Sequence, residues 1–286
     1  MVDPLDILRA PVTPTDPDPV FAARLRARLE RALALPRGVL VSQTNTTTEV
    51  VTAQEPSYRH GDVGYAWLSV PDIDRAVAFH AAVLGWSAGP GSDREGRQVQ
   101  GHTPGLGLHG GEARSTLNCC YAVEDIAAAV ARVRLAGGDA GEPQQAPYGL
   151  VADCHDDQGT IFALYQPPAG VGSQPPATGG HGDLVYVSFE VVDSARARAF
   201  YGAVLHWSFA PGSVQDSWQV QGAMAGLRGG FPQGTTLPMW RVEDLTAAVA
   251  RVRAAGGTAA EPHIRPYGQE AECADDQGTR FYLGQL

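Results

Sequence analysis

Apolar positions divide residues 61–167 into two similar halves. The run Tyr65–Val70 predicts a strand, and Asp72 then caps a helix whose apolar residues recur every three or four positions up to Leu84. Short glycine-punctuated segments follow as far as His109 and predict further strands. The first half therefore has the order strand, helix and three strands.

The second half repeats this order. Leu117–Val123 predicts a strand, and Asp125 caps a helix that a Gly-Gly pair ends. Further strands follow, among them those expected near Leu150–Cys154 and Thr160–Tyr165, which an Asp-Asp-Gln-Gly turn joins. Each half is thus a βαβββ module. Two paired modules predict an α+β domain whose curved sheet carries helices on one side.

The whole domain then occurs a second time. Asp125–Leu164 aligns without a gap on Asp244–Leu283, with 26 of 40 positions identical. Farther upstream, Trp86 and the segment Gln-Val-Gln-Gly recur 121 residues later, so a two-residue deletion separates the two regions. A period of this length corresponds to a whole domain.

Segments of different composition frame the two copies. Residues 1–60 begin with a Pro/Asp-rich stretch and contain one predicted amphipathic helix at about 19–35. Residues 168–181 are rich in Pro and Gly, which predicts a linker. The predicted organisation is an N-terminal extension at 1–60, one domain at 61–167 and a second at 182–286. The N-terminal helix is expected to dock on the body or on a second copy in a homo-oligomer, and a targeting or regulatory role is the alternative.

Charge and cysteine content exclude several classes. The formal net charge of −10 disfavours nucleic acid and anionic membranes as partners. All 21 basic residues are arginine, which excludes Schiff-base and phosphate-loop lysines. The four cysteines have neither zinc-clip nor disulfide-framework spacing, and no hydrophobic signal core is present. We therefore expect a cytoplasmic protein with reduced thiols.

Two local patterns carry a resemblance to a known family. The first strand, capping Asp and helix are VPDIDRAVAFHAAVLGW in one copy and VVDSARARAFYGAVLHW in the other. The closing turns and strands are DDQGTIFALYQ and DDQGTRFYLGQ. Together they resemble the vicinal oxygen chelate superfamily, which contains glyoxalase I, bleomycin-resistance proteins and extradiol dioxygenases. They are similar in particular to tandem-domain glyoxalase-like proteins of actinobacteria. The resemblance implies two tandem domains, each with a cleft inside its curved sheet.

The resemblance also implies a divalent metal, held by the first, fifth and eighth strands and commonly by His, His and Glu. Counted from the capping aspartates and turn glycines, the corresponding positions hold Tyr65, Asn118 and Ala163, then Tyr186, Leu237 and Tyr282. Phenol, amide and alkyl groups do not make a site of useful affinity for a hard metal. We therefore expect no metal and no cofactor.

Strand alternation predicts which side chains face each cleft, because residues two apart share a face. In the first domain the candidate ligand-binding residues are apolar or aromatic apart from one amide: Tyr65, Trp67, Asn118, Cys120 and Ala163. They suit a flat hydrophobic ligand that stacks on Trp67 and hydrogen-bonds to Asn118 or Tyr65. The alternative is a collapsed cleft, filled by its own side chains.

The second domain carries charges on the same face. Its candidate residues are Tyr186, Glu190, Arg241, Arg280 and Tyr282. The intervening positions are uniformly apolar, which fixes the register. The charges are expected to pair with each other or with a bound anion, or else to lie solvated at strand ends.

The leading hypothesis is a metal-free binding protein of the glyoxalase and bleomycin-resistance type, which holds or sequesters an aromatic or apolar organic molecule. One alternative is a lyase, isomerase or dioxygenase-like enzyme with non-standard catalytic residues. Another is an interaction module with closed clefts. The sequence does not identify the ligand, the working cleft, any catalytic residue, the oligomeric state or the role of residues 1–60.

Overall fold

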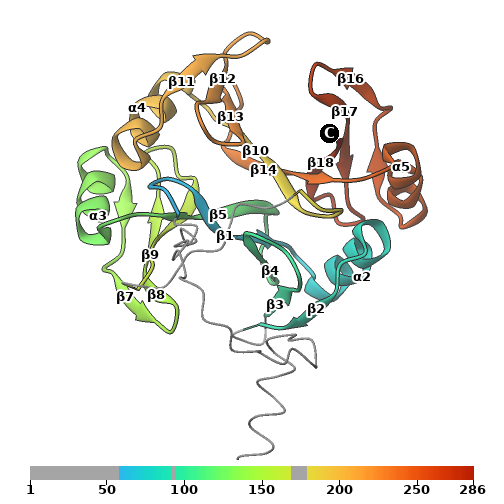
Figure 1. The fold of residues 1–286 in the computed structure, drawn as a ribbon, viewed down its shortest axis with the longest axis horizontal. Helices are drawn as coiled ribbons and strands as arrows, with labels where there is room; N and C mark the ends of the chain where they lie inside the picture. Colours follow the sequence, from blue (N-terminus) through green and yellow to red (C-terminus); the bar gives the residue numbers. More distant parts are fainter. Residues whose placement is uncertain (1–57, 92–94, 169–178) are drawn as a thin grey trace, which may run out of the picture. The chain divides into compact units, whose positions relative to one another are not determined.

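The computed structural model describes residues 58–91, 95–168 and 179–286. The predicted helix at 19–35 and most of the predicted linker lie outside these residues. The described residues form two nine-stranded sheets with four helices, and both sheets belong to one compact unit, Gln54–Leu286 (Figure 1). The α+β prediction, with two curved-sheet domains, is confirmed.

The first sheet joins a βαβββ module and a second module, which has one additional short strand, through one antiparallel pair. The first module contains β1 (Val63–Ser69), α2 (Ile73–Leu84), β2 (Ala88–Pro90), β3 (Gly96–Val99) and β4 (Gly105–His109). The second contains β5 (Thr116–Ala122), α3 (Ile126–Leu135), β6 (Asp139–Ala140), β7 (Gln144–Ala146), β8 (Gly149–His155) and β9 (Ile161–Gln166). The strand order is β2-β3-β4-β1-β5-β9-β8-β6, with β7 on β8. Strand β1 runs antiparallel to β5, and this pair joins the modules.

The second sheet has the same topology. Its first module contains β10 (Leu184–Glu190), α4 (Ser194–Leu205), β11 (Phe209–Pro211), β12 (Ser217–Val220) and β13 (Ala225–Arg228). Its second contains β14 (Thr235–Arg241), α5 (Leu245–Ala254), β15 (Thr258–Ala259), β16 (His263–Arg265), β17 (Gly268–Ala274) and β18 (Arg280–Gln285). The order β11-β12-β13-β10-β14-β18-β17-β15 matches the first sheet strand for strand.

The helices begin where the sequence predicted. The Asp72 carboxylate accepts hydrogen bonds from the N–H groups of Asp74 and Arg75, and Asp193 caps α4 in the same way. These bonds satisfy backbone donors that a helix start leaves unpaired. At the other end, Gly85 adopts a left-handed conformation with φ 70°, whereas the second copy places His206 there at φ 57°.

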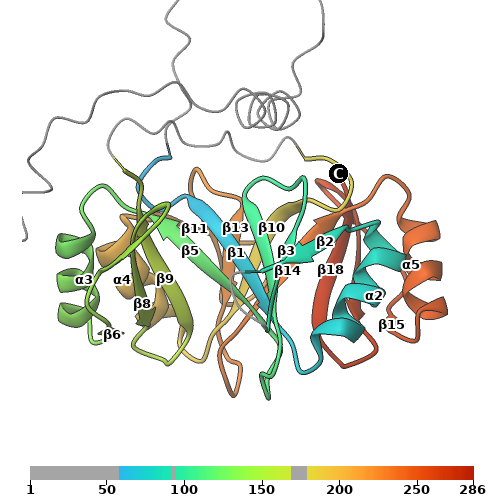
Figure 2. The same cartoon turned by 90° about the horizontal axis from the view of Figure 1, so that it is seen from below.

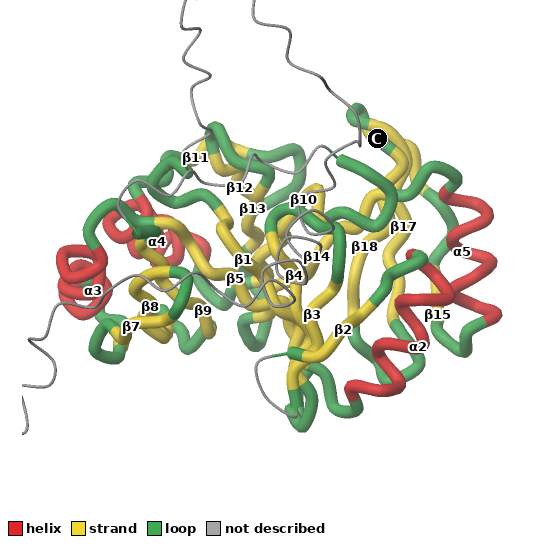
Figure 3. Tube along the Cα trace, turned by 60° about the horizontal axis from the view of Figure 1, so that its bottom comes forward, coloured by secondary structure: helices red, strands yellow, loops and turns green. Residues whose placement is uncertain are grey.

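The two sheets pack back to back. Figure 1 shows them curving away from each other, with β1 and β5 beside β10 and β14. Helix α2 packs against α5, and α3 against α4, at the two ends of the sheets (Figures 2 and 3). The apolar positions of the strands are buried there, as predicted. They face a core shared with the other domain, however, and not only the helices of their own domain.

Aromatic side chains from both domains meet in this shared core. Trp86 contacts Trp240 with ring centroids 4.8 Å apart, and the equivalent pair Tyr121 and Trp207 lies at 5.3 Å. Both pairs are edge-to-face, a favourable geometry for aromatic rings. The core therefore has an approximate twofold symmetry that follows from the sequence duplication.

A reciprocal clamp closes the interface at both ends. The Gln277 side chain accepts from the Asp72 N–H at 2.8 Å and donates to the Asp72 carbonyl oxygen at 2.9 Å. Gln158 makes the same two bonds to Asp193, at 2.7 and 3.1 Å. The Asp-Asp-Gln-Gly turn of each domain thus binds the start of the first helix of the other domain.

This clamp predicts a specific loss of stability. Gln277→Ala and Gln158→Ala should each lower the free energy of unfolding by about 1–2 kcal/mol, because each removes two hydrogen bonds. Since the two sites are at opposite ends, the effects should add in the double variant. Urea denaturation measures this, with exposed Gln215→Ala as the control. Unchanged stability in both variants would mean that the clamps contribute nothing to domain packing.

One buried polar position breaks the symmetry of the core. The Tyr201 hydroxyl donates to Asp156 at 3.1 Å. The equivalent residues are His80 and Asp275. Within the described structure neither His80 Nε2 nor Asp275 Oδ2 has a hydrogen-bond partner, although His80 is fully buried. Burial disfavours the charged imidazole and lowers the pKa of His80.

His80→Tyr should therefore stabilise the protein by about 1 kcal/mol, because the phenol can make the bond that Tyr201 makes. The substitution should also reduce the pH dependence. With a lowered folded-state pKa, His80 adds full stability above pH 6.5, its value without perturbation, and that stability is lost as pH falls toward the folded-state pKa. Melting temperatures from about pH 8 down to about pH 5 test both effects. A variant that melts lower throughout this range would contradict the assignment.

Candidate functional site

The strand register defines the row of residues across the first cleft. Tyr65 lies opposite Cys120, which is next to Ala163 on β9. Asn118, which the sequence count placed in the fifth-strand position, lies opposite Trp67 instead. Cys120 and Asn118 are two residues apart on β5 and so lie on the same face of the sheet. In the second domain the corresponding row is Tyr186, Met239 and Tyr282, not Leu237.

These rows do not fit a metal held by histidine and carboxylate. Burial raises the pKa of Cys120 to about 12, so this thiol stays protonated at neutral pH. Burial likewise raises the pKa of the Tyr65 phenol to about 12. Across the described ranges, no three His, Cys, Asp or Glu side chains are grouped so that they could hold a metal ion.

The floor of the first cleft is closed. Asn118, Cys120 and Ala163 are 2%, 6% and 3% exposed, and the Asn118 amide donates to Ser69 at 3.0 Å. Aromatic rings with partial or full exposure come from the same cleft strands and the turn before β8: Tyr65, Trp67, Tyr148 and Tyr165. A ligand would meet these rings first, and Asn118 lies beneath the accessible surface.

A tyrosine–glutamine pair occurs in both clefts. The Tyr65 hydroxyl donates to Gln98 at 3.1 Å, and the Tyr186 hydroxyl donates to Gln219 at 2.7 Å. Each tyrosine lies over a glycine of the neighbouring strand. A Cβ added at Gly107 would be 2.2 Å from the Tyr65 oxygen, so a larger residue does not fit there. The sequence analysis missed this pair, although its signal was the repeated Gln-Val-Gln-Gly segment.

Charges in the second cleft are satisfied by one another. Arg280 donates to both carboxylate oxygens of Glu190, at 2.7 and 2.8 Å, and also to Glu272. The bonds to Glu190 raise the pKa of Arg280 further. Arg241 lies at the opposite end of β14, because Thr235, at the start of that strand, pairs with Glu190. The structure thus brings Glu190 and Arg280 together and leaves Arg241 apart.

Strand β17 adds acidic groups that the sequence analysis did not count. Glu270 is 8% exposed, accepts a hydrogen bond from Arg265 at 2.6 Å and accepts another from Tyr267 at 2.5 Å. Glu272 shares Arg280 with Glu190. Carboxylates therefore outnumber arginines in this part of the cleft. A bound anion is not favoured here, and the expected bidentate arginine is already occupied.

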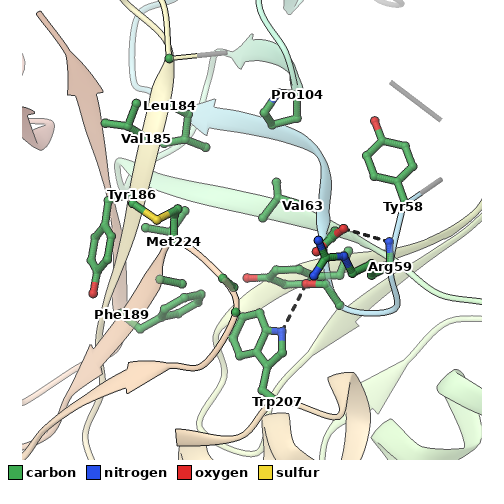
Figure 4. A pocket seen from close by; sticks show the side chains of 18 of the residues that line it. Tyr58, Arg59, Val63, Pro104, Leu184, Val185, Tyr186, Phe189, Trp207 and Met224 are labelled. Atoms are coloured by element: carbon green, nitrogen blue, oxygen red, sulfur yellow. Dashed lines mark hydrogen bonds between the residues drawn. The ribbon is translucent and has the colours of Figure 1, made fainter. Parts of the chain in front are cut away.

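A pocket of about 450 Å³ lies where the two sheets meet; its lining includes none of the candidate residues of the first cleft, but it does include Tyr186 of the second. We call it the seam pocket. Its walls include side chains of both domains, among them Val63, Tyr121, Phe189, Trp207, Ala223 and Ala225. Figure 4 shows Phe189, Val63 and Met224 around it, with Trp207 held by a hydrogen bond from its indole N–H to the Gly61 carbonyl oxygen at 3.2 Å. The sequence analysis did not predict this pocket.

Comparisons with known proteins agree with this architecture. Residues 66–165 match the family described as Glyoxalase-like domain. Among solved structures, the Mn(II)-bound glyoxalase from Novosphingobium aromaticivorans is 15% identical, with a TM-score of 0.63, over 79% of this chain and 82% of that one. A 2,2',3-trihydroxybiphenyl 1,2-dioxygenase from Sphingomonas wittichii is 16% identical, with a TM-score of 0.59, over 80% and 91%.

A catechol 2,3-dioxygenase is 15% identical, with a TM-score of 0.61, over 78% of this chain and 87% of that one. A search of curated proteins gave no match. The described chain has the fold of the vicinal oxygen chelate superfamily, in two tandem domains, and its first domain is glyoxalase-like. This confirms the resemblance seen in the sequence. Within the described residues, no helix is both long and apolar enough to span a membrane.

Proposed function

We propose that this protein binds a small aromatic or apolar organic molecule in the cleft of its first domain, without a metal. The observation that carries the proposal is the aromatic surface above the closed floor. Tyr65, Trp67 and Tyr165 are partly exposed there, and Tyr148 is 62% exposed. Flat rings stack well on such a surface, and the Tyr65 and Gln98 pair supplies polar atoms for orientation.

Binding is favoured over catalysis because the phenol and thiol groups of the clefts have raised pKa values. A general base works best with a pKa near the working pH. The pKa values of Tyr65 and Cys120 are raised to about 12, and burial raises the pKa of Tyr282 to about 12 as well. Glu190 is tied to Arg280 by two hydrogen bonds. The two phenols and the thiol therefore stay protonated at neutral pH and cannot serve as general bases.

The enzymatic alternative rests on the superfamily fold alone. The similar structures are named as dioxygenases and as a Mn(II)-bound glyoxalase, but those activities belong to those proteins. The rows at Tyr65 and Tyr186 do not supply an equivalent ligand set. We therefore propose the binding role and leave ring cleavage and lyase chemistry out of the proposal.

Trp67→Ala tests the proposed cleft. Catechol is a suitable first probe, and its binding to the full chain can be measured by calorimetry. The loss of buried aromatic area should weaken binding by about 1–3 kcal/mol, which is about five- to 150-fold. The equivalent residue in the second domain is Ser188, so Ser188→Ala is the matched control and should leave binding unchanged.

Native mass spectrometry before and after organic extraction complements this test, because it detects a ligand that co-purifies. Loss of the co-purified molecule in the Trp67 variant, but not in the control, would support the proposal. If the wild-type chain neither carries an organic molecule nor binds catechol, or if Trp67→Ala leaves binding unaltered, the proposed cleft is wrong.

A further inference from the structure

The seam between the domains is duplicated, and its two halves differ. Gly101 and Gly222 occupy equivalent turns, with φ of 81° and 78°. The residue that follows is His102 in the first copy and Ala223 in the second. On the next strand, Leu106 pairs with Ala66, and its counterpart Ala225 pairs with Val187. Two large side chains on one side thus correspond to two alanines on the other.

The first half of the seam is filled. The His102 ring lies edge-on to Trp86, with ring centroids 5.7 Å apart, and its Nδ1 is 2.8 Å from the Asp183 carboxylate. The side chains of His102 and Asp183 are each only 10% exposed. Leu106 is 2% exposed. His102, hydrogen-bonded to Asp183, thus fills this side of the seam together with Trp86 and Leu106.

The other half has the same framework without the filling. Trp207 corresponds to Trp86, and Asp62 corresponds to Asp183. Ala223 and Ala225 replace the histidine and the leucine, and the seam pocket lies here, lined by Trp207 (Figure 4) and by Asp62 among others. The pocket therefore lies on the side of the seam that lacks the imidazole and the leucine side chain, although Val187 replaces Ala66 there.

We propose that the seam pocket binds a small aromatic heterocycle with an N–H donor. The ring would pack against Trp207, and its N–H would donate to the Asp62 carboxylate, as His102 does to Asp183. The proposal does not depend on the function assigned to the first cleft, because it uses a different cavity and different residues.

The size and charge of the pocket agree with this ligand class. A volume of about 450 Å³ lies in the range of small-molecule sites, roughly 300–1,000 Å³. The walls are mainly apolar side chains, such as Val63, Phe189 and Met224. Arg59 and Asp62 carry opposite charges, so the lining favours an uncharged ring over a polyanion.

Calorimetry on the full chain tests this proposal with benzimidazole and its N-methyl derivative, which lacks the donor. Benzimidazole should bind saturably to the wild-type chain. The double variant Ala223→His with Ala225→Leu fills the pocket with the residues used on the other side, and should abolish binding. Asp62→Asn and the N-methyl probe should each weaken binding by about tenfold, because each loses a hydrogen bond to a charged acceptor.

Thermal unfolding controls for folding, and the filled variant should melt at least as high as the wild type. If it does not fold, Ala223→His alone provides the same test with a smaller change. Trp67→Ala should bind benzimidazole normally, which separates this site from the first cleft. No saturable binding to the wild-type chain, or binding that the filling substitutions do not alter, would overturn the proposal.

Discussion

The structure depends on the burial of two apolar sheet faces against each other. Each curved sheet places alternate side chains on its convex side, where the helices of its own domain and the other domain together cover them. The clamps from Gln158 and Gln277 fix the angle between the domains at both ends. This explains why the Asp-Asp-Gln-Gly turns stayed alike in the two copies. They hold the partner domain as well as closing their own hairpin.

Because the shared core carries the stability, the concave faces were able to diverge. The first cleft exposes aromatic rings over a closed floor, whereas the second is crossed by ion pairs from Arg280 and Arg265. The seam diverged as well, since Ala223 and Ala225 replace His102 and Leu106. One duplicated framework thus presents three chemically different surfaces. They are an aromatic cleft, a charged cleft and an apolar pocket.

Local patterns predicted much of this fold. The caps at Asp72 and Asp193, the strand alternation and the duplication gave the element order and the buried faces, because each depends on nearby residues. Cross-strand register does not, so the pairing of Tyr65 with Cys120 and of Trp67 with Asn118 came only from the structure. Glu270 was missed since its strand has no simple alternation. The recurrence of His60 as His181, 121 residues later, was overlooked in the sequence. In the structure His60 contacts the Val204 carbonyl oxygen of the other domain at 3.1 Å.

The seam pocket needs contacts between residues more than 100 positions apart, which no local pattern reveals.

The proposed function requires that neither cleft holds a metal ion. Elemental analysis of the full chain, purified without chelator and then titrated with Mn(II), tests the claim directly. The account predicts well under one equivalent of metal per chain and no saturable Mn(II) binding, since the rows at Tyr65 and Tyr186 lack histidine and carboxylate ligands. One equivalent of tightly bound metal, lost on substitution of either tyrosine, would contradict it.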